Sequence, residues 1–230
     1  MSEASTAAPA PTSTWHMYRA MVGVGVCCGL LIVGVFQATR PVIERNKAEA
    51  LRSAIFRVLP DATASTTFRL GESGGFTPVE SDAAGGAGER LVYAGYDDDQ
   101  ELVGLAVEAQ GMGYQDVIRL IYGYSFSDEA IIGMQVLESK ETPGLGDKIE
   151  TDPSFLENFE RLDVSLGQDQ SSLAHPIVPV RHGNKTDPWE VDGITGATIS
   201  SEAIANILNQ SAQHWIPLIQ RNLQDFRGNE

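Results

Sequence analysis

Cysteine is nearly absent from this 230-residue chain. Its two cysteines, Cys27 and Cys28, are neighbours in the sequence and lie inside a long apolar run near the N-terminus. No cysteine follows between residues 29 and 230. The part of the chain that can fold as a globular domain therefore has no disulfide and no cysteine-based metal or iron–sulfur site.

Positive charge is also scarce. The chain carries 31 acidic and 16 basic side chains, for a formal net charge of −15. A nucleic-acid-binding surface needs clustered lysine and arginine, so this composition argues against a nucleic-acid partner. The same acidity weakens the long-range attraction of a free phosphate-bearing ligand, a difficulty that a covalent bond to the chain would remove.

Recognisable catalytic signatures are missing as well. The four histidines, His16, His175, His182 and His214, show no metal-ligand spacing. The acidic run at 97–99 lacks the spaced oxygen ligands of a calcium loop and is typical of a hairpin turn or a solvated edge. The chain has neither a P-loop nor a Gly-x-Ser-x-Gly elbow. We expect no catalytic acid, base or nucleophile, and no metal site.

Only one long hydrophobic run is present. Residues 20–38 hold no charged side chain and are bounded by Arg19 and Arg40. At helical rise such a run reaches about 28 Å, close to the ~30 Å thickness of a bilayer core. We therefore expect a disordered tail at 1–18, rich in Ala, Ser, Thr and Pro, a transmembrane anchor at 19–40 and a soluble domain at 41–230.

Two kinds of cleaved or lipidated signal are alternative interpretations of this run. A signal-peptide cleavage site after Ala38 would need a small residue at the −3 position, where the chain has Phe36. A lipoprotein signal at Cys27 would need a small residue where the chain has Val26. Both observations favour an uncleaved anchor.

The charges beside the run leave the orientation of the anchor open. Arg19 precedes it, whereas Arg40, Arg45 and Lys47 follow it, a distribution that favours a cytoplasmic C-terminal side. This rule weakens where a long domain follows, because long domains are translocated largely regardless of charge.

Periodicity and turn signals predict an α+β domain after the anchor. Apolar side chains recur at helical spacing over 42–59 and 203–223, and Pro217 is expected to kink the second helix. Two strand-like runs, 117–126 and 130–138, are separated by a short turn and predict a hairpin. The other expected elements are a loop at 81–88, a strand at 102–108, a short helix at 153–159 and a strand at 177–180 that Pro179 would keep at an edge. We expect a twisted, mostly antiparallel sheet flanked by helices.

The most specific local signal is a turn that carries hydroxyl groups before the last expected helix. Residues 192–198 read Asp-Gly-Ile-Thr-Gly-Ala-Thr, and Ser200, Ser201 and Glu202 are suited to cap the helix that follows and to form its first turn. The N-terminus of a helix offers free backbone N–H groups and favours negative charge. Gly196 and Ala197 would let a phosphate approach the backbone, so Thr198 is well placed to contact a phosphate or to be esterified by one. An ordinary loop-to-helix junction is the simpler alternative.

A second segment has the composition of a loop that contacts a ligand. Residues 141–146 read Glu-Thr-Pro-Gly-Leu-Gly, in which Pro143 and Gly144 form a strong turn signal. Gly146 keeps the backbone free of bulk, so this loop can lay its amides and Leu145 against a flat ring. Taken alone, the segment favours a plain turn after a strand.

Together and in this order, the two segments resemble the FMN-binding domain of the G subunit of the Rnf electron-transport complex and of the C subunit of the Na⁺-pumping NADH:quinone oxidoreductase. In the family motif Asp-x-x-(Ser/Thr)-Gly-Ala-Thr, the last threonine carries FMN through a phosphoester bond that a separate flavin transferase makes from FAD. The resemblance implies that Thr198 is the attachment site. The cofactor-binding residues that it further implies are Asp192, Thr195, Gly196, Ala197, Glu141, Thr142, Pro143, Gly144, Leu145 and Gly146.

One loop departs from the family pattern. The family usually has another glycine after Gly-Tyr, whereas here Gly113 and Tyr114 are followed by Gln115 and Asp116. We expect this loop to have a different shape.

The resemblance implies an electron-carrier subunit with covalent FMN in a membrane-bound complex that couples electron transfer between ferredoxin and NAD to ion translocation. The implied partners are the other subunits of the complex, the flavin transferase and membrane lipid. The implied location is a bacterial inner membrane, with the soluble domain on the periplasmic side. Chain length and residues 144–150 favour the G subunit over the related C subunit. The alternatives are a C-type subunit, and a flavin module with a sensory or scaffolding role and no electron turnover.

Overall fold

The computed structural model describes residues 14–79 and 90–227, and the chain divides into two units between Lys47 and Ala48. A single helix, α1 (Thr14–Val58), forms the described part of the first unit and extends into the second. Residues 14–18 of the expected tail are therefore helical. Residues 1–13 of that tail and the expected loop at 81–88 lie outside the described residues.

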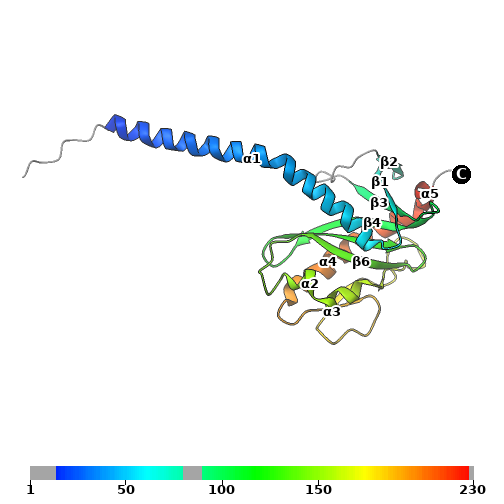
Figure 1. The fold of residues 1–230 in the computed structure, drawn as a ribbon. Coiled ribbons are helices and arrows are strands. Elements are labelled where there is room, and N and C mark those ends of the chain that lie inside the picture. The colour runs from blue at the N-terminus through cyan, green and yellow to red at the C-terminus, as the bar shows by residue number, and fades with distance from the viewer. Residues whose placement is uncertain (1–13, 80–89, 228–230) are drawn as a thin grey trace, which may run out of the picture. The chain divides into compact units, whose positions relative to one another are not determined.

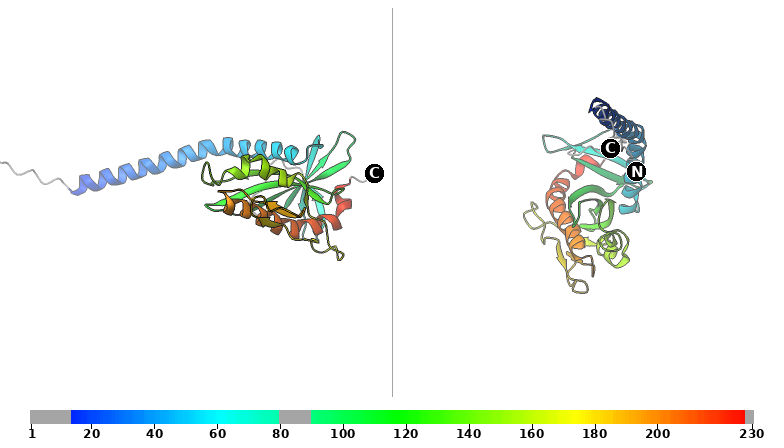
Figure 2. Two further views of the ribbon diagram at one scale, coloured as in Figure 1. Left: turned by 90° about the horizontal axis from the view of Figure 1, so that it is seen from below. Right: turned by 90° about the vertical axis from the view of Figure 1, so that its left-hand side faces the viewer.

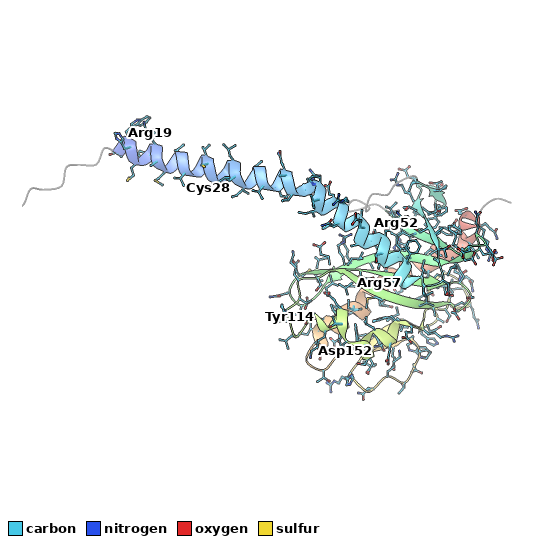
Figure 3. The ribbon with its side chains drawn as sticks, viewed as in Figure 1. Arg19, Cys28, Arg52, Arg57, Tyr114 and Asp152 are labelled. Atoms are coloured by element: carbon cyan, nitrogen blue, oxygen red, sulfur yellow. The ribbon has the colours of Figure 1, made fainter. Side chains whose placement is uncertain are left out.

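The first unit has the properties of a membrane span. Within the described residues, α1 is the one helix that is long and apolar enough to cross a bilayer. Its apolar side chains before Lys47 are exposed, with Leu30 and Ile32 each 70% accessible. Figure 3 shows Arg19 and Cys28 on this helix, which carries its side chains on all sides. Apolar surface of this kind is costly in water, and a bilayer removes the cost.

The second unit is built on a seven-stranded antiparallel sheet (Figure 1). The strands are β1 (Ala64–Leu70), β2 (Phe76–Pro78), β3 (Leu91–Tyr96), β4 (Leu102–Met112), β5 (Val117–Ser125), β6 (Ala130–Glu138) and β7 (Leu162–Asp163), in the spatial order β2-β1-β3-β4-β5-β6-β7. β5 and β6 form the expected hairpin, with Ser125 opposite Ala130. A separate parallel pair joins β8 (Val178–Val180) to β9 (Glu190–Asp192). The expected α+β class with a mostly antiparallel sheet is confirmed.

The helices of the second unit differ from expectation at their ends. They are α2 (Lys148–Thr151), α3 (Pro153–Leu156), a 3₁₀ turn (Glu157–Phe159), α4 (Thr198–Arg221) and α5 (Leu223–Phe226). α4 begins at Thr198 rather than at residue 203, and it continues through Pro217. Ser200 and Ser201 lie in its first turn, as expected, and both are buried. The N-cap residue is Ala197, so their expected role as capping residues is wrong.

α4 and the end of α1 cover opposite faces of the sheet (Figure 2). Side chains alternate between the two faces along a strand. On β5, Leu120 and Tyr122 belong to the core under α4, whereas Ile121 belongs to the core under α1. The side chains that α1 contributes to that second core are Leu51, Ala54, Ile55 and Val58. The sheet is therefore buried on both faces, and its loops at one end are free to form a site.

Candidate functional site

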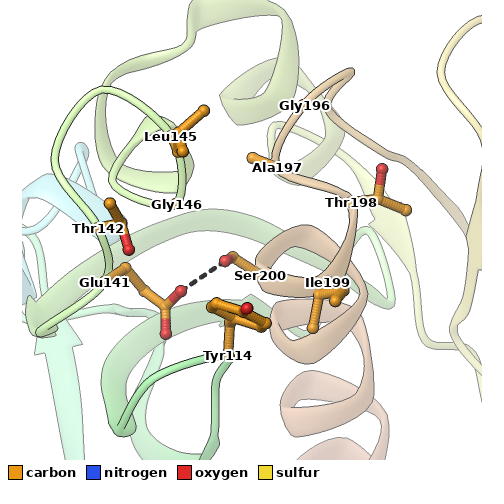
Figure 4. A pocket seen from close by; sticks show the side chains of 10 residues that line it. All are labelled: Tyr114, Glu141, Thr142, Leu145, Gly146, Gly196, Ala197, Thr198, Ile199 and Ser200. Carbon is orange, nitrogen blue, oxygen red and sulfur yellow. Dashed lines mark hydrogen bonds between the residues drawn. The ribbon is translucent and has the colours of Figure 1, made fainter.

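The two segments singled out in the sequence meet around one cavity of about 370 Å³ (Figure 4). Three stretches of chain form its walls: the turn between β4 and β5, the loop at 141–146 and the start of α4. The lining residues are Tyr114, Glu141, Thr142, Leu145, Gly146, Gly196, Ala197, Thr198, Ile199 and Ser200. Small-molecule sites commonly have volumes of about 300–1,000 Å³, so this cavity has the size of a ligand site.

Seven of the eleven expected cofactor-binding residues line this cavity. The four that do not are Pro143, Gly144, Asp192 and Thr195. Pro143, Gly144 and Thr195 are exposed, and Asp192 has partners elsewhere in the fold.

The loop at 141–146 is closed by its own backbone. The carbonyl oxygen of Thr142 accepts hydrogen bonds from the N–H groups of Leu145 (3.1 Å) and Gly146 (3.0 Å). Gly144, in the middle of the turn, has φ +78°, a left-handed conformation that glycine adopts without strain. The two amides are engaged within the turn, so the loop offers the cavity the side chain of Leu145, which is 53% exposed.

Glu141 connects all three walls through its carboxylate. Oε2 accepts a hydrogen bond from the Ser200 hydroxyl at 2.6 Å, which Figure 4 marks, and Oε1 accepts one from the Gln115 N–H at 3.0 Å. Two glycines enclose the carboxylate. A Cβ on Gly113 would lie 2.4 Å from Oε1, and one on Gly146 would lie 2.6 Å from Oε2. A side chain at either position would crowd the carboxylate, and one at Gly113 would also crowd Ile118.

Thr198 is the first residue of α4 and lies at the rim of the cavity. The first hydrogen bond of the helix runs from the Ser201 N–H to the Ala197 oxygen at 3.0 Å, so the backbone amides before Ser201 precede the helical ladder. Gly196, with φ +87°, turns the chain into the helix, whose first turn has no acidic residue. The Thr198 hydroxyl has one long contact, to the Ile194 oxygen at 3.5 Å, and Figure 4 shows it directed away from the Glu141–Ser200 pair. Thr198 as a whole is exposed.

Asp192 supports the loop that precedes the threonine turn. Its carboxylate accepts hydrogen bonds from the Gly183 N–H at 2.8 and 3.0 Å and lies 3.4 Å from Nδ1 of His182. Its backbone N–H donates to Oδ1 of Asn158 at 2.9 Å, and its carbonyl accepts from Nδ2 of the same side chain at 3.1 Å. In this structure Asp192 lies outside the cavity, and its hydrogen bonds join neighbouring segments of the fold.

An ion pair lies beside the cavity at the β4–β5 turn. Nζ of Lys140 is 2.6 Å from Oδ2 of Asp116, and the hydrogen bond from Lys140 lowers the pKa of the Asp116 carboxyl. The same contact raises the pKa of Lys140. Lys140 is thus paired with Asp116, and it is not among the residues that line the cavity.

Three lining residues were not predicted as site residues: Tyr114, Ile199 and Ser200. Tyr114 is 63% exposed at the tip of the β4–β5 turn (Figure 3), and Ile199 is 56% exposed at the start of α4. The Gly113-Tyr114 pair was the available signal for the first. For Ile199 the signal was an isoleucine exposed in the first turn of a helix. This signal can be used only once the start of the helix is known.

The lining of the cavity carries little charge. Among the ten lining residues the sole charged side chain is that of Glu141, and none is lysine or arginine. The apolar part of the lining comes from Tyr114, Leu145 and Ile199, all more than half exposed. The cavity can therefore contact a flat, largely apolar ring, but it offers no cationic side chain to a phosphate.

Comparison with known proteins connects this site to a family. The FMN-binding domain family matches residues 113–213, which include all three walls. The chain is 30% identical over 196 residues to the G subunit of the ion-translocating oxidoreductase complex of Methanosarcina acetivorans, and the match covers 84% of this chain and 90% of the relative. It is 34% identical to the G subunit of the complex of the same name from Escherichia coli K12 over 127 residues, covering 55% of this chain and 56% of that protein.

Two crystal structures share the fold. Shewanella oneidensis NqrC matches with a TM-score of 0.61 at 16% identity, covering 78% of this chain and 99% of that protein. The C subunit of the Na(+)-translocating NADH-quinone reductase from Parabacteroides distasonis matches with a TM-score of 0.57 at 19% identity, covering 81% and 96%. At these identities the likeness concerns the fold alone.

Proposed function

The chain belongs to the family of the G subunits of ion-translocating oxidoreductase complexes, and on that premise we propose that it is an electron-carrier subunit whose FMN is bonded to Thr198 by a phosphoester. The flavin supplies the redox chemistry, since it can take up two electrons and release them one at a time. The chain positions the cofactor and adjusts its electrostatic surroundings. No catalytic acid, base or nucleophile of its own is needed for this role.

The walls of the cavity suit the two ends of FMN. Leu145, Tyr114 and Ile199 offer apolar surface to the isoalloxazine ring. Thr198 and the first amides of α4 offer a hydroxyl and N–H donors to the phosphate, in the positive field of the helix N-terminus. The exposed position of Thr198 suits esterification by a separate enzyme after the domain has folded.

The observation that carries the proposal is the combination of this hydroxyl with a lining that has no lysine or arginine. A phosphate monoester held without ion pairs, on a chain of net charge −15, is retained weakly. An ester bond retains it permanently and also removes one of its negative charges. A covalent bond therefore retains FMN at a site whose lining suits the ring but offers no cationic side chain to the phosphate.

The surroundings of the protein follow from the same premise. We assign residues 19–40 to the bilayer of a bacterial inner membrane and residues 41–230 to an FMN-binding domain on its periplasmic side. The partners are the other subunits of the complex, a flavin transferase and membrane lipid. The complex as a whole couples electron transfer between ferredoxin and NAD to ion translocation.

The test is the mass of the intact full-length chain, purified from cells that contain the flavin transferase. We expect the mass to include one esterified FMN, and the denatured chain to fluoresce in a gel. Thr198→Val should lose both signals because it removes the hydroxyl and keeps the shape of the side chain. Thr66→Val, at an exposed position on β1, is the matched control and should keep them. Fluorescence that persists in Thr198→Val would reject the attachment site.

A second measurement distinguishes an electron carrier from a protein that has a scaffolding role and no electron turnover. If complexes that contain the Thr198→Val chain assemble and keep full electron transfer, the electron-carrier role is lost and a scaffolding role remains.

A further inference from the structure

Glu141 is the one charged side chain among the buried residues of the described chain, with 6% of its surface accessible. Its carboxylate accepts two hydrogen bonds, from Ser200 and from the backbone of Gln115, and donates none. Acceptor-only bonding on both oxygens is the pattern of an ionised carboxylate. Within residues 14–79 and 90–227, no lysine, arginine or histidine lies within ion-pair distance of it. Its negative charge is therefore solvated by dipoles and is not neutralised.

The carboxylate is enclosed on three sides. Gly113 and Gly146 pack against its two oxygens so closely that neither position has room for a Cβ. Ser200, on α4, holds the third side. Glu141 is also one of the ten lining residues, so a ligand in the cavity has this charge in its wall. A charge fixed in this way acts on the ligand whatever its redox state.

We propose that Glu141 lowers the reduction potential of the flavin through this buried negative charge. The inference rests on the proposed function, because it assigns a role to a wall of the same site. When a redox partner delivers two electrons and the ring takes up one proton from water, the reduced ring carries one negative charge. An anion nearby in a region of low polarity raises the free energy of that reduced state relative to the oxidised one. The flavin then gives up its electrons more readily.

Two substitutions can separate the effect of the Glu141 charge on the flavin from the effect of the Glu141 packing. Glu141→Gln keeps the length of the side chain and can accept from Gln115 while its amide faces the Ser200 hydroxyl, so it removes the charge and keeps the packing. Glu141→Asp has a shorter side chain that reaches less far toward Ser200, so it loosens the packing but keeps the charge. These two variants form a matched pair.

The experiment is a redox titration of the flavin absorbance in full-length chains purified in detergent, with flavin content measured first by intact mass. We expect a midpoint potential more positive than that of the unaltered chain in Glu141→Gln, and one close to the unaltered value in Glu141→Asp. Equal potentials in Glu141→Gln and the unaltered chain, at equal flavin content, would overturn the inference. So would equal shifts in both variants, because they would assign the effect to packing.

A second set of samples keeps this inference apart from the covalent bond. FMN is added to chains that carry Thr198→Val, with and without Glu141→Gln, and the same potentials are measured. If the unaltered chain proves to carry no esterified FMN, the attachment proposal fails by itself. The added-FMN samples then decide the role of Glu141: a positive shift supports it, and no shift rejects it.

Discussion

Ser200 and Glu141 lie 59 positions apart in the sequence and are joined by a hydrogen bond of 2.6 Å from the serine hydroxyl to Oε2 of the carboxylate. Both side chains are buried. Hydrogen bonds to charged groups are worth about 1.5–3 kcal/mol, roughly twice as much as those between neutral groups. This bond fastens the start of α4 to the loop that follows β6.

Ser200→Ala should therefore lower the free energy of unfolding by about 1.5–3 kcal/mol, because it leaves a buried carboxylate without one of its two donors. Ser211→Ala, on the same helix, is the matched control. It removes a neutral contact of 3.0 Å to the Tyr122 hydroxyl and should cost about 0.5–1.5 kcal/mol. Urea denaturation measures both. A smaller loss in Ser200→Ala than in Ser211→Ala would contradict the assignment of a charged bond.

Gly146→Ala should weaken the binding of FMN. The added Cβ would lie 2.6 Å from Oε2 of Glu141 and 2.9 Å from Oγ of Ser200, so the pair must separate to admit it. Gly144→Ala is the comparison, because its Cβ would meet nothing within 4 Å although φ is +78°. That change costs about 1–2 kcal/mol of backbone strain but leaves the wall intact. Titration of FMN into Thr198→Val chains should show a larger loss of affinity for Gly146→Ala, and equal losses would count against the packing argument.

Stability should fall at alkaline pH because of a buried tyrosine. Burial raises the pKa of Tyr124 to about 12, whereas tyrosine in an unfolded chain titrates near pH 10. Between these values the unfolded chain loses a proton that the folded chain keeps. The stabilising contribution is thus complete below pH ~10 and is lost as the pH rises toward 12. Burial also raises the pKa of Tyr122, so the two residues act in the same direction.

The measurement is thermal melting between pH 9 and pH 11. Tyr124→Phe should have a lower melting temperature throughout, because Nε2 of Gln220 loses its partner at 2.6 Å. Its melting temperature should nevertheless fall less steeply with pH than that of the unaltered chain. An identical slope would show that Tyr124 does not contribute to the alkaline transition.

The end of α1 should be required for the folding of the second unit. A chain that begins at Ala48 retains Leu51, Ala54 and Ile55, which fill the core on one face of the sheet. We expect it to stay in solution without detergent and to melt cooperatively. A chain that begins at Thr63 lacks these side chains and should aggregate, because the truncation of one buried Leu or Ile already costs about 2–5 kcal/mol. Cooperative melting of the shorter chain would refute this.

Sequence patterns predicted the centre of the fold better than its edges. The hairpin of β5 and β6 was predicted because two long apolar runs flank a short turn. β1, β2, β3, β7 and β9 were not predicted. β1 reads Ala-Ser-Thr-Thr-Phe-Arg-Leu, with few apolar side chains, and β7 has two residues. Such strands exist because a neighbouring strand offers them hydrogen bonds, which no local pattern records.

The two segments that form the site were predicted, but the hydrogen bonds that join them to other parts of the fold were not. The two segments could be recognised locally because turns and helix starts have local chemistry. The partners of Glu141 and Asp192 could not, because Ser200 and Gly183 reach them only through the tertiary fold. The expected capping role of Ser200 was wrong for the same reason: its hydroxyl binds a carboxylate from another segment, and the helix begins before it.

The mouth of the cavity is bordered by Tyr114, Leu145 and Ile199, all more than half exposed. An opening that lets a reduced ring pass electrons to a protein partner also admits dioxygen. On the proposed function, the purified protein exposes this mouth to solvent, so its reduced flavin should pass electrons to dioxygen and generate superoxide or peroxide. We expect a partner subunit that covers the mouth to slow this reaction, and a cell that assembles the complex soon after flavin loading would then produce less of these oxidants.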